Sequence, residues 1–116
     1  MNDPTPEFLQ GTFAFTGAGY DQPSVFAEGL TDRVPGTRRA RVIYFRGGNS
    51  STEMVNVALP RDGKPMRHFP IGAKGAVHVP FAVVEDLEPD QTVTLLVAAP
   101  AGCSGILIID AGLIEI

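Results

Sequence analysis

Residues 105–116, which close the chain, read GILIIDAGLIEI and constrain the fold more than any other stretch. Successive side chains of a β-strand point to opposite faces. The odd-numbered positions here are mostly Leu, Ile and Ala, and the even-numbered positions include Ile106, Ile108, Ile114 and Ile116. Both faces of such a strand are apolar, so we expect both to be covered. The core of the chain covers one face, and the N-terminal segment or a second copy covers the other.

Asp110 lies among these isoleucines on the even-numbered face. A carboxylate that loses water must be paired or hydrogen-bonded. An arginine from residues 38–46 is the natural partner, within the chain or across an interface. The sequence does not decide between these two possibilities.

Turn-forming residues divide the remaining chain into short segments. Thirteen glycines and ten prolines are spread over 116 residues, and nowhere do apolar residues recur at helical spacing over ten residues. Apolar runs of the kind seen in strands occupy residues 12–16, 24–27, 39–46, 52–59, 66–71, 75–84, 92–99 and 106–116. We predict one all-β domain over residues 12–116, a β-sandwich, jelly roll or small barrel of about seven to nine short antiparallel strands with negligible helix.

Residues 1–11 carry Pro4 and Pro6 ahead of the first predicted strand. Proline fits neither the interior of a helix nor a central strand. We therefore predict an extended N-terminal arm with Pro4, Pro6 and Phe8 as its contact residues. The chain start lacks the pattern of a signal peptide. No apolar run reaches the ~20 residues that a membrane helix needs, so no membrane partner is expected.

The sequence contains no pattern that predicts catalysis or metal binding. The single cysteine, Cys103, lies in a Gly-Cys-Ser-Gly turn without a neighbouring base. His68 and His78 flank a bend, but a metal site would also need a third ligand such as Glu53 or Asp62 to converge with them. We expect no catalytic residue, no cofactor and no metal.

Charges are clustered in two segments. Five of the nine basic residues are arginines within residues 33–46, and four of the thirteen acids lie within residues 85–90. One interpretation is two solvated surface regions. In the other, the guanidinium forks of Arg38, Arg39 and Arg41 on one copy meet Glu88 and Asp90 on a neighbour, a contact between different patches that builds rings or lattices. The net charge of −4 and the lack of an aromatic-rich face argue against nucleic acid as a partner.

Residues 87–93, LEPDQTV, resemble the turn before the sixth strand of fibronectin type III and related immunoglobulin-like domains. That family has Leu, then Pro two residues on, then Tyr at the start of the strand. Val93 stands where the Tyr would be. The resemblance implies an immunoglobulin-like sandwich.

Three further features together resemble small all-β accessory proteins of tailed bacteriophages, such as capsid decoration proteins. They are the arm MNDPTPEFLQG, the lack of disulfides among strands punctuated by Gly and Pro, and the closing strand GILIID. The resemblance implies a homo-oligomer such as a trimer, seated on a larger protein assembly in a virion. A protein outside a virion would be cytoplasmic.

We therefore predict a non-enzymatic structural protein that self-associates through apolar strand faces and its arm. The alternative is a small carbohydrate- or ligand-binding module that uses loops 17–23 and 46–51, with Tyr20 as a stacking ring. The second loop contains the glycosylation triplet Asn49-Ser50-Ser51, which we interpret as a chance match in a polar turn.

Overall fold

The computed structural model describes residues 3–25, 30–61, 64–81 and 86–116. Within these residues the chain is all-β, with eleven strands and no helix. The strands are β1 (Thr5–Thr16), β2 (Ser24–Val25), β3 (Thr31–Arg33), β4 (Ala40–Asn49), β5 (Val55–Arg61), β6 (Lys64–Ile71), β7 (Ala76–Pro80), β8 (Asp86–Leu87), β9 (Thr92–Thr94), β10 (Leu96–Ala98) and β11 (Ser104–Glu115). The all-β prediction is confirmed, and the count exceeds nine because residues 92–99 form two strands and the short strands β3 and β8 were not predicted.

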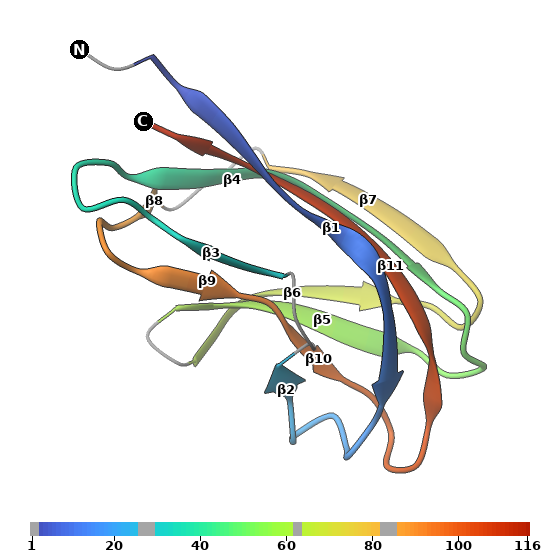
Figure 1. Cartoon of the computed structure of the whole chain (residues 1–116). Coiled ribbons are helices and arrows are strands. Elements are labelled where there is room, and N and C mark those ends of the chain that lie inside the picture. Colours follow the sequence, from blue (N-terminus) through green and yellow to red (C-terminus); the bar gives the residue numbers. More distant parts are fainter. Residues whose placement is uncertain (1–2, 26–29, 62–63, 82–85) are drawn as a thin grey trace.

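Two antiparallel sheets pack face to face as a sandwich (Figure 1). The first sheet has the order β1-β11-β4-β7, and β8 pairs with the end of β4. The second has the order β2-β10-β5-β6, and β3 and β9 form a separate pair. The strands run along the long dimension of a molecule that measures 48 × 24 × 24 Å. The closing strand that was predicted to have two apolar faces is β11, and it lies mid-sheet between β1 and β4.

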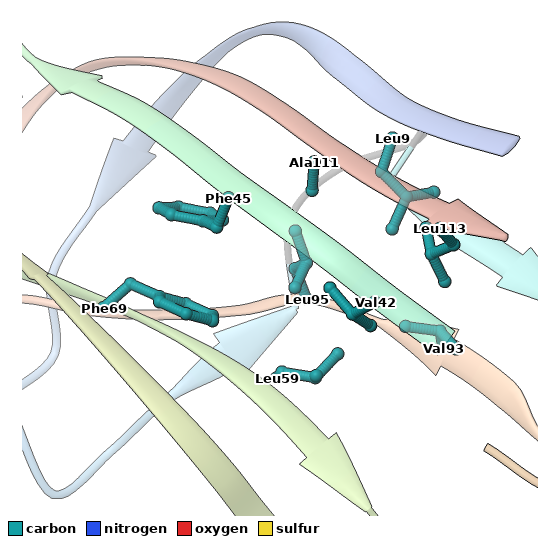
Figure 2. Close-up of a pocket in the computed structure, with 9 residues that line it drawn as sticks. All are labelled: Leu9, Val42, Phe45, Leu59, Phe69, Val93, Leu95, Ala111 and Leu113. Carbon is teal, nitrogen blue, oxygen red and sulfur yellow. The ribbon is translucent and has the colours of Figure 1, made fainter. Parts of the chain in front are cut away.

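The core consists of the facing side chains of the two sheets. The odd-numbered residues of β11, from Leu107 to Leu113, are buried and form the inner face of that strand. Phe45 of the first sheet stacks on Phe69 of the second with ring centroids 4.2 Å apart (Figure 2). One void between the layers measures about 10 Å³ and is lined by apolar side chains. A void of this size and character offers no place for a ligand.

From Thr5 onward, the segment predicted as an arm is the first half of β1, an edge strand of the first sheet. It pairs with β11 in an unbroken register from Thr5↔Glu115 to Thr16↔Ser104, and Leu9 is buried in the core. A proline is tolerated on an edge strand, which explains how Pro6 fits. The N-terminal segment therefore lies beside β11 in the same layer and does not cover its even-numbered face.

One smaller prediction was wrong. Residues 47–49, predicted as loop, belong to β4 and pair with β11, and Gly47 and Gly48 also pair with β7. A β carbon at residue 47 would lie 2.6 Å from Ile71 Cδ1 of the opposite sheet, so a larger residue there would force that core side chain to shift. Parts of the predicted runs at 24–27 and 75–84 lie outside the described residues, as does Asp62, considered above as a metal ligand. Among the described residues β6 is an edge strand, paired with β5.

Candidate interaction surface

The even-numbered face of β11 and the matching faces of its neighbours form one continuous surface, which we call the outer face. Strand register aligns its side chains in three rows that cross the strands in the order β1, β11, β4, β7. The rows are Thr12–Ile108–Gly48–Ala76, Gln10–Asp110–Arg46–His78 and Phe8–Gly112–Tyr44–Pro80. No other described element lies over this surface (Figure 1).

Large apolar side chains are exposed on the outer face. Phe8 is 54% exposed, Ile106 48% and Ile108 61%, and Ile116, just after β11, is 45% exposed. Isolated exposed apolar residues are ordinary on a protein surface. Here, however, Phe8, Ile106 and Ile108 lie on two neighbouring strands of one sheet face, and such a gathering marks a contact site. Three of the four isoleucines predicted as interface are thus exposed, and Ile114 is half-buried.

An open depression of about 350 Å³ lies beside Ile108, lined by Arg46, Gly47, Gly48, Ala76, Val77, Ile108 and Asp110. Its cause is local. Gly48 has no side chain, and a β carbon built there would meet no atom within 4 Å. The next residue in the row, Ala76, is small. The outer face therefore carries a protrusion, Ile108, immediately next to a hollow.

Asp110 is held at the centre of the outer face by two neutral donors. Gln10 Nε2 donates to Asp110 Oδ1 at 3.0 Å, and the Tyr44 hydroxyl donates to the same oxygen at 2.8 Å. These hydrogen bonds, led by that of Gln10, and the charge of Arg46 outweigh burial and lower the pKa of Asp110. Burial and the hydrogen bond to Asp110 raise the pKa of Tyr44. Asp110 therefore favours its ionised form and lies in a polar row between exposed Phe8 and exposed Ile108.

Arg46 faces Asp110 in strand register, and its guanidinium carbon lies 5.4 Å from the centroid of the Tyr44 ring. The predicted pairing of Asp110 with an arginine of residues 38–46 is thus met in part, since Arg46 contributes charge while Gln10 and Tyr44 donate the hydrogen bonds. Sequence reasoning missed these two donors because only the pairing of β1, β11 and β4 brings them to Asp110.

The two charge clusters meet within one chain. Arg33 Nη2 lies 2.7 Å from Asp90 Oδ1, and Arg39 Nε lies 4.0 Å from Glu88 Oε2. Arg38 joins the start of β1 to the end of β11 by donating to Thr5 Oγ1 at 2.8 Å and to the Glu115 carbonyl at 3.0 Å. These charges are satisfied without a neighbour, and their use between copies stays a prediction, as does that of Arg41.

A group of acids lies at the end of the sandwich where β1, β3 and β11 meet. Glu115 is only 5% exposed, and burial raises its pKa, with the charges of Asp32 and Glu7 adding to the rise and Arg38 opposing it. Burial and Glu7 also raise the pKa of Asp32, whose Oδ2 is buried without a hydrogen bond. In the part of the chain that the structure describes, no group of acids, His or Cys is arranged to hold a metal ion.

The remaining predicted sites are dispersed. His68 lies on β6 and its Nδ1 is 2.9 Å from Asn56 Nδ2, whereas His78 lies on the other sheet, edge to face with Tyr44. Asn49 is buried, and its Nδ2 donates to the carbonyls of Glu53, Ile71 and Gly72. The glycosylation triplet is therefore inaccessible in the folded chain, and residues 46–51 are held in place by strand pairing and by Asn49.

Tyr20, the proposed stacking ring, is half-exposed and donates to the Met54 carbonyl at 2.9 Å. Cys103 is half-buried and free. In the described residues no helix is long and apolar enough to cross a membrane.

No family model matches the chain, and no curated protein matches it. Among solved structures, an appendage protein of Bacillus endospores, from a family of disulfide-linked pili, is similar with 11% identity and a TM-score of 0.51 over 98% of this chain and 89% of that chain. A chain in the structure of infectious bursal disease virus, Gt strain, aligns with 14% identity and a TM-score of 0.45 over 97% of this chain. This chain spans about a third of that one, since 32% of it is covered. The appendage protein shows that the two chains share a fold.

Proposed function

We propose that this protein is a non-enzymatic structural subunit that associates with copies of itself through the outer face of its first sheet. One observation carries the proposal. Phe8, Ile106 and Ile108 are all exposed on that face, and Ile108 lines the hollow over Gly48. A monomer gains nothing from such a surface, whereas burying it in an interface is favourable by roughly 25 cal/mol per Å² of apolar area.

The sheet edges are a less favourable route to association. Pro6 lies on the edge strand β1, and Pro80 ends the edge strand β7. Prolines on edge strands act against edge-to-edge pairing because they remove backbone donors. The face of the sheet is therefore the preferred contact, with Phe8 as the contribution of the N-terminal segment.

The proposed setting is a large protein assembly. More specifically, we propose that the assembly is a phage virion and that the protein is a capsid decoration subunit or another accessory subunit of it. The pilus-forming appendage protein supports only the suitability of this sandwich for polymeric assemblies. Its pili are disulfide-linked. This chain has one cysteine, and one thiol cannot link a subunit covalently to two neighbours. Assembly here would be noncovalent.

The ligand-binding alternative has less support. Of its two proposed loops, residues 46–49 are part of β4, and Asn49 fixes the turn that follows. Tyr20 contributes one half-exposed ring without a second aromatic side chain beside it among the described ring contacts.

The test is sedimentation velocity of the protein and of the double variant Ile106→Thr/Ile108→Thr, which keeps β-branched residues in the strand. The matched control is Val25→Thr/Met54→Thr, which removes two exposed apolar side chains that lie off the outer face. We expect the outer-face variant alone to lose the associated species. Equal association in all three proteins would refute the proposal.

A further inference from the structure

When a row of the outer face is placed against the same row running in the opposite direction, the side chains that meet are complementary. Read from β1 to β7, the central row is Gln10, Asp110, Arg46, His78; the row that flanks it on one side is Thr12, Ile108, Gly48, Ala76. A row read backwards places an acid against a base and a large side chain against a glycine. The strand order produces this complementarity, because Asp110 and Arg46 are register partners on the two central strands β11 and β4, as are Ile108 and Gly48.

We propose that two copies pack outer face to outer face about a two-fold axis that lies in the interface, parallel to the strands and between β11 and β4. The inference rests on the proposed function and specifies the partner and symmetry of the same surface. Such an axis reverses each row and keeps each row opposite itself. The contact is isologous, with the same patch on both copies.

The axis brings complementary groups together at the two central strands, β11 and β4. Asp110 of each copy faces Arg46 of the other, and Ile108 of each copy faces the hollow over Gly48 of the other. At the margins Phe8 faces Pro80, and Gln10 faces His78. Two charge pairs and two protrusion-to-hollow contacts result, and no charged group is left opposite an apolar one.

The other in-plane axis is unfavourable. A two-fold axis through the central row and perpendicular to the strands would leave each strand opposite itself. Asp110 would then face Asp110 and Arg46 would face Arg46. Like charges placed opposite each other destabilise a complex by several kcal/mol. The charges thus select the axis parallel to the strands.

The surface has the size that such a contact needs. Stable interfaces bury about 800 Å² on each partner, and a sheet face in a molecule of 48 × 24 × 24 Å provides that area. Face-to-face sheets pack about 10 Å apart with strands within about 30° of each other, which the proposed axis permits.

Charge reversal tests the symmetry. In Asp110→Arg both facing pairs become two cations, and in Arg46→Asp both become two anions. Each variant alone should associate at least about tenfold more weakly than the unmodified protein. Mixed together, the two variants should form a 1:1 heterodimer in which every facing pair has opposite charges. The chain that carries both substitutions should pair with itself again. Glu53→Arg and Lys74→Asp make the same charge changes off the outer face and should leave association unchanged.

A second pair of variants probes the same axis without removing the hydrogen bonds of Asp110. Ile108→Ala leaves two hollows and Gly48→Val leaves two protrusions, so each should pair poorly with itself and well with the other. Circular dichroism confirms that each variant is folded, and native mass spectrometry counts homodimers and heterodimers.

The outcomes separate the inference from the proposed function. Preferred heterodimers of Ile108→Ala with Gly48→Val support the axis, because that axis places residue 108 of one copy opposite residue 48 of the other. Preferred heterodimers in the charge mixture alone support contact through the outer face and overturn the axis. Self-association of the unmodified protein without preferred heterodimers in either mixture overturns the axis and leaves the proposed function standing. An unmodified protein that stays monomeric overturns both.

Discussion

Ile108 of β11 and Gly48 of β4 are register partners on the outer face, so a highly exposed isoleucine stands next to a residue with no side chain. The first prediction follows from the open space at residue 48, where an added β carbon meets nothing within 4 Å. Gly48→Val should raise the free energy of unfolding by up to about 1 kcal/mol, because glycine weakens a strand. The same variant should associate less, because its side chain fills the hollow.

Urea unfolding at low protein concentration and light scattering at high concentration measure the two effects. Gly72→Val is the control, since it also points into open space but lies in the turn after β6. A Gly48→Val protein that associates as well as the unmodified one would show that the hollow has no partner.

Adjacent isoleucines on β11 give a second prediction. Ile109 is 1% exposed and faces the core, whereas Ile108 points outward. Ile109→Ala should lower the free energy of unfolding by about 2–5 kcal/mol, as large-to-small core changes do. Ile108→Ala should change it by no more than about 0.5 kcal/mol in dilute solution, where copies are separate. Chemical denaturation compares the two, and equal losses would show that the two faces of β11 are assigned wrongly.

Buried Glu115 makes stability depend on pH. Because its pKa is raised in the folded chain, the folded state holds the proton more tightly than the unfolded state does. The stability associated with this group is therefore highest in acid and falls as the pH rises through the folded-state pKa. Glu115→Gln should raise the free energy of unfolding at pH 7, and the gain should vanish below the ordinary glutamate pKa of about 4.3.

Urea unfolding at pH 7 and in acid measures this difference, with exposed Glu53→Gln as the control. A variant no more stable than the unmodified protein at pH 7 would mean that Glu115 is not strained by its burial among acids.

Asp110 has the opposite dependence. Its pKa is lowered, chiefly by the Gln10 hydrogen bond, so its contribution to stability is complete above the unfolded-state pKa and is lost as the pH falls through the folded-state pKa. Gln10→Leu should raise the pKa of Asp110, and Tyr44→Phe should raise it less. An NMR titration of the Asp110 carboxyl carbon reads these shifts, and Thr12→Val on the same strand is the control. An Asp110 pKa insensitive to Gln10 would contradict the assigned cause.

The sequence predicted the all-β sandwich and the two apolar faces of the last strand because both follow from local alternation. It did not show which face is inner, since that depends on which distant strands pair with β11. Asp110 illustrates the same limit: its donor Gln10 is 100 residues away and reaches it only through the pairing of β1 with β11. A local pattern contains no such information.

Two interpretations of the sequence were incomplete for similar physical reasons. Pro4 and Pro6 excluded a central strand, but an edge strand was equally compatible with them, and β1 begins at Thr5. The arginine and acid clusters were interpreted either as solvated surface regions or as a contact between copies, and the β3–β9 pair brings Arg33 beside Asp90 within the chain. Both outcomes depend on long-range pairing that charge and proline content do not specify.

The mass of the unmodified protein in solution tests most directly whether the outer face joins copies. Light scattering over a range of concentrations should give a mass that rises from 12.3 kDa in dilute solution to a multiple of that value, beginning with the pair about the proposed axis. A mass that stays at 12.3 kDa up to millimolar concentration would contradict the account, because the exposed isoleucines would then have no partner of their own kind.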